Sequence, residues 1–316
     1  MSCGKKNSTK TLFERNIYFS EYTELYNIII ITLMMLTNIM CVSVVIARDE
    51  ERGIAKVLKS LRYQTLRPYI IVVDDGSIDR TPEIASDLSD YLIRLPRHKR
   101  PWAGMPLLAR VFNAGFEVAR ELDPDFVLVS GSDAIYPLKY IETIIRRMKK
   151  HSVVVASGVA ENERAKCPRG SGRIIDARWF NLIGFKYPEN WGFESYIIFK
   201  ALSMGYRVQV YHDIHFKLIR ETMINPLKAY YWGLGMRALG YWTPYALYRI
   251  VFHFLKSPLV AIYMFKGYSN KGVEKYKDIV TFVSTFQKSL MIYKLNPLAY
   301  LSEFKEFLTL PSISSY

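Results

Sequence analysis

The chain has 316 residues, of which 50% are hydrophobic and 23% are charged, and its formal net charge is +14. This composition excludes a largely disordered chain, and a mean hydropathy of +0.02 argues against several membrane spans. The excess of 43 basic over 29 acidic residues predicts a phosphate-bearing partner, whether nucleic acid, anionic lipid or nucleotide. Three scattered cysteines argue against a disulfide framework or a cysteine-based zinc site.

The first 40 residues differ in character from the rest, and we treat 1–40 as an N-terminal extension. An uncharged apolar stretch runs from Leu25 to Met40, which is shorter than the roughly 20 residues that a membrane span needs. No small-residue cleavage site follows it, so a secretory signal is not expected. Three interpretations stay open: an interfacial anchor helix, a true span, or a translated leader upstream of a start at Met34, Met35 or Met40.

From residue 41 onward, short β-branched runs alternate with helical periodicity. Strands are predicted at 42–46, 69–73, 91–95, 126–130, 153–157 and 207–211, and helices at 53–64, 81–88, 106–122, 138–150 and 195–204. Strands that are apolar throughout, with a helix after each, are typical of a parallel sheet covered by helices on both faces. Residues 161–193 break this rhythm and are expected to form loops around a short helix near 176–182. We therefore predict an α/β domain over residues 41–222.

The region 223–316 has a different composition. From residue 222 to the end there are 11 basic and 4 acidic residues, and long aromatic and aliphatic runs are interrupted by single cations. Such runs are typical of amphipathic helices that lie in a membrane interface. The alternative is a helical cap that packs on the sheet domain and exposes a basic face. We favour the interface, which makes a membrane surface one expected partner.

Acidic residues follow three of the predicted strands. The segments concerned are 47–50 (Ala-Arg-Asp-Glu), 74–77 (Asp-Asp-Gly-Ser) and 131–133 (Gly-Ser-Asp). Because ligands of open α/β sheets bind at the carboxyl ends of the strands, the three segments together predict a binding site. Each acid alone would be an ordinary helix cap. The chain has neither a G-x-G-x-x-G loop nor a Walker sequence, which argues against a dinucleotide oxidoreductase and a P-loop NTPase.

Two segments resemble a known family. Residues 42–85, which contain the DDGS-x-D-x-T element, and residues 109–137, which contain Asn-Ala-Gly, are similar to family 2 glycosyltransferases of the GT-A fold. The resemblance covers about residues 42–222. It implies an inverting hexosyl transfer from a UDP-, GDP- or dTDP-sugar to a lipid-linked or glycan acceptor. Together with the basic tail, it implies a peripheral or monotopic enzyme at the cytoplasmic face of the membrane. Nucleic acid is not an expected partner, because no motif of that class occurs.

The resemblance also assigns a donor site. The residues expected to bind the nucleotide sugar are Ala47, Arg48, Asp49, Asp74, Asp75, Gly76, Ser77, Arg110, Asn113, Ser132 and Arg220. Carboxylates suit this task because they accept hydrogen bonds from base N–H groups and ribose hydroxyls.

The family's D-x-D motif, which binds a divalent cation at the diphosphate, reads Gly131-Ser132-Asp133 in this chain. The first acid is replaced by glycine. The expected Mg²⁺ or Mn²⁺ would therefore depend on Asp133, with His215 as a second ligand, and on phosphate oxygens and water. Basic residues after the third predicted strand offer another way to balance the diphosphate charge: Arg97, Lys99 and Arg100. The glycine also favours an alternative function, a non-catalytic GT-A-like binding or scaffold module.

Inverting members of the family use an acid near the start of a later helix as general base, which deprotonates the acceptor hydroxyl. The matching segment here is 191–195 (Trp-Gly-Phe-Glu-Ser), so Glu194 is the expected base, with Glu189 as the alternative. Asp133 is the second residue expected to act in catalysis. Trp191 has two open interpretations, as a stacking surface for an acceptor sugar or as a core residue.

Overall fold

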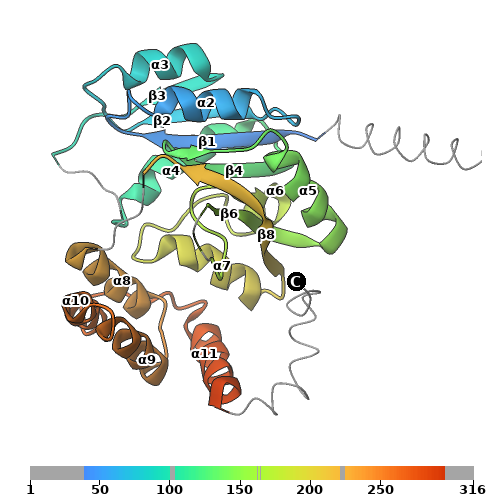
Figure 1. Cartoon of the computed structure of the whole chain (residues 1–316). Coiled ribbons are helices and arrows are strands. Elements are labelled where there is room, and N and C mark those ends of the chain that lie inside the picture. The colour runs from blue at the N-terminus through green and yellow to red at the C-terminus, as the bar shows by residue number, and fades with distance from the viewer. Residues whose placement is uncertain (1–38, 100–103, 162, 164, 221–224, 296–316) are drawn as a thin grey trace, which may run out of the picture. The chain divides into compact units, whose positions relative to one another are not determined.

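The computed structural model describes residues 39–99, 104–161, 163, 165–220 and 225–295 (Figure 1). The chain divides into two units, residues 1–40 and residues 41–316, and the following description concerns the second. The apolar stretch 25–40, apart from its last two residues, therefore lies outside the described residues together with its three interpretations. Arg100 and residues 296–316 also lie outside them. The predicted boundary at residue 222 falls inside the second unit.

Within the described residues, eight strands form one sheet: β1 (Cys41–Ala47), β2 (Tyr69–Asp74), β3 (Tyr91–Arg94), β4 (Phe126–Gly131), β5 (Ala134–Ile135), β6 (Val153–Ala160), β7 (Arg173–Asp176) and β8 (Arg207–Leu218). Their order across the sheet is β3-β2-β1-β4-β7-β6-β8-β5. β1 pairs in parallel with β2 and β4, and β2 with β3, whereas β7 is antiparallel to both of its neighbours. The predicted α/β fold with a mostly parallel sheet is confirmed.

The helices of the sheet region are α2 (Ile54–Arg62), α3 (Thr81–Leu88), α4 (Leu108–Glu121), α5 (Tyr140–His151), α6 (Ala177–Leu182) and α7 (Phe193–Ser203). The central strands are buried over almost their whole length because both faces of the sheet are covered. α4 packs against β1 and β2 at Gly115, where an added Cβ would lie 2.4 Å from Val44 Cγ1 and 2.9 Å from Val73 Cγ2. This close approach requires glycine.

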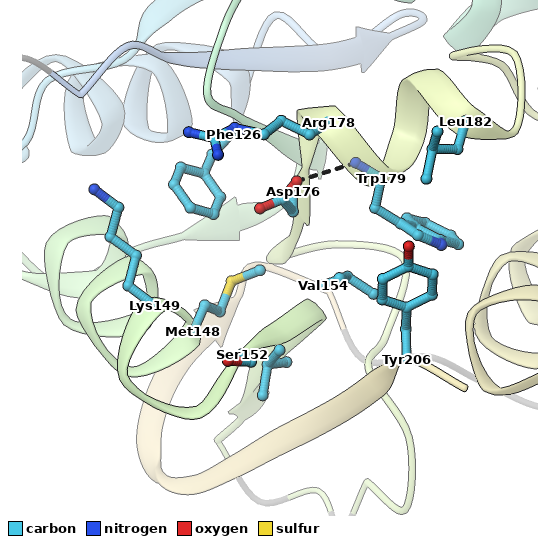
Figure 2. Close-up of a pocket in the computed structure, with 11 residues that line it drawn as sticks. Phe126, Met148, Lys149, Ser152, Val154, Asp176, Arg178, Trp179, Leu182 and Tyr206 are labelled. Carbon is cyan, nitrogen blue, oxygen red and sulfur yellow. Dashed lines mark hydrogen bonds between the residues drawn. The ribbon is translucent and has the colours of Figure 1, made fainter. Parts of the chain in front are cut away.

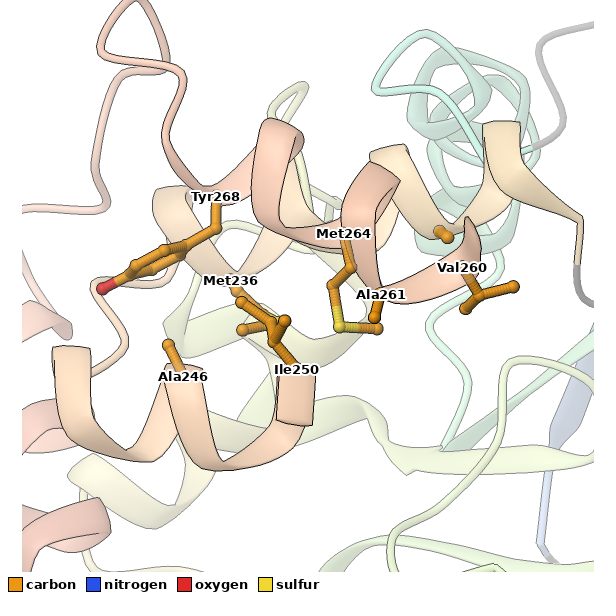
Figure 3. Packing of buried hydrophobic residues seen from close by; sticks show 8 residues of the cluster. Met236, Ala246, Ile250, Val260, Ala261, Met264 and Tyr268 are labelled. Carbon is orange, nitrogen blue, oxygen red and sulfur yellow. The ribbon is translucent and has the colours of Figure 1, made fainter. Parts of the chain in front are cut away.

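In the described part of the chain, four helices follow the sheet: α8 (Pro226–Ala238), α9 (Thr243–Phe254), α10 (Pro258–Tyr268) and α11 (Val280–Leu295). α8, α9 and α10 share a small apolar core, whose side chains meet between them in Figure 3. Gly233 of α8 and Gly267 of α10 bring the two backbones into contact, because a Cβ on Gly233 would lie 2.1 Å from the Met264 carbonyl oxygen. None of the helices that the structure describes is long and apolar enough to cross a membrane.

Candidate functional site

The loops after β1 and β2 are joined by hydrogen bonds at one edge of the sheet. The Asp75 amide donates to the Ala47 carbonyl oxygen (2.8 Å), and the Asp49 amide donates to Ser77 Oγ (2.8 Å). Because β4 pairs with β1 on its other side, with Gly131 opposite Ile46, the third acidic segment ends at the same edge. The structure therefore brings together the three segments that the sequence analysis singled out.

Asp75 belongs to a nearly buried charged cluster with Arg48 and His98. The Arg48 guanidinium donates to the Asp75 carboxylate (3.2 Å) and to the His98 carbonyl oxygen (2.6 Å). His98 Nε2 lies 2.9 Å from the same carboxylate. His98 comes from the loop after β3, and it is a site residue that sequence reasoning missed because no motif surrounds it. The cluster offers hydrogen-bond donors and an acceptor side by side, which suits the edge of a nucleobase.

Asp49 is held in a second ion pair at the same edge. Arg97 donates through both terminal nitrogens to the Asp49 carboxylate (3.0 and 2.9 Å) and also to the Gly76 carbonyl oxygen (2.7 Å). These hydrogen bonds, with one from the Ile78 amide, hold the pKa of Asp49 below its usual value. Gly76 has φ of +70°, and a Cβ there would lie 2.4 Å from Arg97 Cα, so this turn requires glycine.

Asp74 is fully buried and plays a structural part in this arrangement. Its carboxylate accepts from the Ser77 amide (3.2 Å) and lies 3.7 Å from Arg94 Nε. Asp74 therefore shapes the turn that presents Asp75 and Ser77. Its predicted direct contact with the nucleotide stays a prediction.

Asp133 follows β4 and faces a guanidinium. Arg220 Nη2 lies 4.0 Å from Asp133 Oδ2 and donates to the Glu50 carboxylate (2.5 Å). The same guanidinium therefore neighbours two carboxylates. Ser132, between Gly131 and Asp133, is buried. Among the residues that the structure describes, no group of three or more His, Cys, Asp or Glu side chains could hold a metal ion. The expected Mg²⁺ or Mn²⁺ at Asp133 therefore stays a prediction.

The pairing of Asp133 with His215 as metal ligands stays a prediction, and the backbone places the two residues well apart. The Ile219 amide donates to the Asp133 carbonyl oxygen (2.8 Å), and His215 lies four residues earlier in the chain, on β8. At the rise of an extended strand, this separation is roughly 13 Å. The His215 side chain is exposed, three residues before the end of β8.

Glu194 stands in the first turn of α7, against the loop formed by residues 168–171. A Cβ on Gly170 would lie 2.4 Å from Glu194 Oε1, so the carboxylate rests directly on this backbone. The next residue of the loop, Ser171, accepts through Oγ from the Gly131 amide (3.1 Å). The loop therefore connects the predicted base to the end of β4, which the sequence separates by more than 60 residues.

Arg173, at the start of β7, is buried beneath this loop and was not predicted from the sequence. It donates to the Pro168 carbonyl oxygen (3.0 Å) and to the Tyr187 hydroxyl (3.2 Å), and its Nε has no hydrogen-bond partner among the residues that the structure describes. Burial raises the pKa of the Tyr187 hydroxyl, nearby Arg173 lowers it, and nearby Glu194 raises it. Both charges therefore act on the same hydroxyl. Arg173 could only be found in three dimensions, because β7 itself was not predicted.

Two other predicted donor-site residues have protein partners. Asn113 pairs with the backbone of Tyr187, donating to its carbonyl oxygen (2.9 Å) and accepting from its amide (2.8 Å). Arg110 forms an exposed ion pair with Glu189, the alternative base. Both contacts position the segment that leads into α7.

Helix α8 packs on the segment that leads into α7. The rings of Trp191 and Tyr231 lie 5.1 Å apart, and a Cβ on Gly192 would lie 3.2 Å from Gly235 Cα. Trp191 is thus partly buried against α8 but still reaches the surface. The C-terminal helices therefore touch the segment that carries Glu194.

A pocket of about 400 Å³ lies elsewhere, and Figure 2 shows its lining. It includes Phe126 and Val153, the first residues of β4 and β6, together with Trp179 and Tyr206. These strands begin at this pocket, whereas the acidic segments follow the carboxyl ends of β1, β2 and β4. The pocket is therefore separate from the candidate site.

Comparison with known proteins identifies the class to which this protein belongs. The model of glycosyl transferase family 2 matches residues 43–214, which is more than half of the chain, so the protein belongs to this family. Its class is that of a glycosyltransferase. A 4,4'-diaponeurosporenoate glycosyltransferase from Staphylococcus haemolyticus (strain JCSC1435) is 42% identical over 66 residues, which is 20% of this chain and 18% of that relative's length.

One solved structure shows the same fold at low sequence identity, and a second is reported beside it. The mannosyltransferase PcManGT from Pyrobaculum calidifontis, in complex with GDP-Man and Mn²⁺, has 16% identity and a TM-score of 0.50 over 85% of this chain and 80% of its own. TarS 1-349 from S. aureus, in complex with UDP, has 16% identity and a TM-score of 0.49 over 86% of this chain and 76% of its own. The predicted GT-A fold is thus confirmed.

Proposed function

We propose that the protein is an inverting hexosyltransferase that moves a sugar from a nucleotide diphosphate donor to a lipid-linked or glycan acceptor at the cytoplasmic face of the membrane. One observation carries this proposal: the loop 168–171 places the Glu194 carboxylate beside the strand end that holds Asp133. A base and a leaving-group site must lie on opposite sides of one sugar, and this loop joins the two. The family match and the neighbour solved with GDP-Man support a nucleotide sugar as donor.

In the proposed reaction, the Arg48–Asp75–His98 cluster holds the nucleotide through its base edge. Glu194 accepts the proton of an acceptor hydroxyl, and that oxygen forms a bond to the anomeric carbon. The bond from this carbon to the diphosphate oxygen breaks on the opposite face, and its electron pair leaves with the nucleoside diphosphate. The anomeric configuration is inverted because the attacking and departing oxygens occupy opposite faces.

The leaving diphosphate needs positive charge, and the described residues supply it mainly through guanidinium groups. Arg220 lies between Glu50 and Asp133, and Arg97 lies across the turn at Gly76. Stabilising charge that develops in a transition state is commonly the largest catalytic contribution. Binding of Mg²⁺ or Mn²⁺ by Asp133 stays a prediction. Gly131 would contribute no carboxylate to such a site.

A non-catalytic GT-A-like binding module is the second candidate. Gly131 favours it, since the first acid of the D-x-D motif is absent. The position could not take a larger side chain without local movement, because a Cβ there would lie 3.0 Å from both Asp133 Oδ1 and Ser171 Oγ. This module would bind a nucleotide but would not turn over a donor sugar.

The deciding experiment measures the melting temperature of the full chain with UDP, GDP and dTDP, each with and without Mn²⁺. A ligand at about 100 times its dissociation constant adds roughly 2.7 kcal/mol, which gives a clear shift. We expect a shift with one nucleotide, which Asp75→Ala should remove and Asp213→Ala, on the distant β8, should preserve. Hydrolysis or transfer of the matching nucleotide sugar is then measured. Turnover supports the enzyme, and binding without turnover supports the binding module. A chain that responds to none of the nucleotides would contradict both candidates.

A further inference from the structure

Helices α9 and α10 expose many large apolar side chains. We define the outer face by six residues: Leu247 and Val251 of α9, Leu255 directly after α9, and Leu259, Ile262 and Phe265 of α10. Their exposed fractions range from 41% at Leu247 to 81% at Leu255. Soluble proteins seldom leave large apolar side chains gathered in this way, and such patches mark interaction surfaces.

The outer face is distinct from the core that holds the helices together. On α9, the buried residues Ala246 and Ile250 are one turn apart and lie in the core shared with α8 and α10 (Figure 3). Leu247, Val251 and Leu255 follow each other at the same one-turn spacing and are exposed. On α10 the buried Met264 and the exposed Ile262 likewise lie on different sides. The exposed residues are therefore not needed to pack the three helices.

Charge around the outer face has one sign. Residues 225–273 contain six basic residues and no Asp or Glu. Two of these cations, Lys256 and Lys266, are exposed within the hairpin of α9 and α10, and the Lys256 ammonium lies 5.0 Å from the centre of the Phe252 ring. A second copy of the chain would bring like charges together at such an interface. An anionic lipid surface matches both the apolar side chains and the cations.

The same helical region borders the site. Tyr231 of α8 packs on Trp191, and a Cβ on Gly104 would lie 3.3 Å from the Tyr231 ring. A bilayer on the outer face would therefore hold a lipid-linked acceptor near the helix that contacts the Glu194 segment.

We propose that the outer face of α9 and α10 docks the protein on an anionic bilayer, with the apolar side chains in the interface and Lys256 and Lys266 at the lipid phosphates. The inference deepens the proposed function, on which it rests for the role of the bilayer as the source of the acceptor. Docking of this kind needs no spanning helix.

The test places an environment-sensitive nitrobenzoxadiazole label on the outer face of the full chain. Cys3→Ser and Cys167→Ser leave Cys41, whose burial raises the pKa of its thiol to about 12 and keeps it unreactive. The label is then attached at Leu255→Cys or, as a matched control, at Tyr63→Cys, which is 71% exposed at the end of α2. Phosphatidylcholine vesicles with and without phosphatidylglycerol are added to each.

We expect the emission at position 255 to rise several-fold and shift to the blue with phosphatidylglycerol vesicles, and the emission at position 63 to stay unchanged. Lys256→Gln with Lys266→Gln should weaken vesicle binding about 25-fold, since a basic residue near an anionic surface contributes about fivefold. Lys59→Gln, on the exposed side of α2, should leave it unchanged.

Two outcomes would overturn the inference. A label at position 255 that stays in water while the protein sediments with vesicles would assign binding to another part of the chain. A blue-shifted label without vesicles would show that a segment of the chain already covers the face. Nucleotide-induced melting shifts, measured without vesicles, report on the donor site separately, so a failure of docking is distinguishable from a failure of the proposed function.

Discussion

The strand-end site and the outer face of α9 and α10 differ in how their charged side chains are arranged. At the site, the acids Asp49, Asp75 and Asp133 each lie next to a guanidinium, so local charges are paired although the chain carries +14 overall. On the outer face, Lys256 and Lys266 stand among exposed apolar side chains, and the segment 225–273 contains no acid. Paired, partly buried charges orient one ligand, whereas unpaired exposed cations attract a surface without fixing its orientation. Net charge alone therefore does not reveal where a protein binds.

The largest expected effect separates chemistry from binding within the site. Glu194→Gln should lower sugar transfer about 10³-fold, because the amide cannot accept the acceptor proton. Nucleotide binding should stay within about twofold, since Glu194 contacts the loop at Gly170 and not the Arg48–Asp75 cluster. Initial rates and melting shifts with the same nucleotide check both parts. Glu189→Gln is the matched control, and if it removes transfer while Glu194→Gln does not, Glu189 is the base.

A smaller loss is expected at the end of β4. Asp133→Ala should lower transfer by about 10²-fold, which corresponds to roughly 2.7 kcal/mol of transition-state stabilisation. Removing this carboxylate also leaves Arg220 with Glu50 as its remaining acidic neighbour. Asp213→Ala, which breaks the exposed pair with Arg147, should keep full activity. An active Asp133→Ala variant would exclude this residue from the reaction.

A third variant acts on the helical region and leaves the site in place. Gly233→Ala should destabilise the packing of α8 against α10 by about 1–3 kcal/mol, because its Cβ would lie 2.1 Å from the Met264 carbonyl oxygen. Thermal unfolding measures the loss, and Gly272→Ala, which meets a side-chain atom only at 3.3 Å, is the control. Equal melting temperatures for the two variants would contradict the close contact of the helices.

The smallest effect concerns pH. Hydrogen bonds from Arg97 lower the pKa of Asp49, so the folded state favours the ionised carboxylate. This stabilisation is fully present above the unfolded pKa, about 4, and is lost as the pH falls through the lower folded value. Asp49→Asn should therefore differ from the parent chain by a constant amount between about pH 5 and 7, and the difference should shrink below about pH 4. Melting curves across this range that keep a constant gap would contradict the assignment.

Periodicity and motif spacing account for much of the fold. The strands β1, β2, β4 and β6 are apolar on both faces, and the helix of Leu108–Glu121 repeats buried residues every three or four positions, so each was predicted near its observed bounds. β7 was missed because four residues, Arg173–Asp176, carry too little pattern to distinguish a strand from a loop. β8 is longer than predicted, reaching Leu218, because its polar residues alternate with buried ones beyond Tyr211.

Some residues of the candidate site were likewise predictable from the sequence, and others were not. The acids at the ends of β1, β2 and β4 and the position of Glu194 follow from local sequence, since strand ends and helix starts are local features. His98, Ser171 and Arg173 come from loops and from an unpredicted strand, and only tertiary packing brings them to the acids. The same holds for the outer face: sequence shows apolar residues in α9 and α10, but which of them are buried depends on where α8 lies. Pairing of charges and exposure of apolar side chains are properties of contacts, and contacts between distant segments are set by the folded chain.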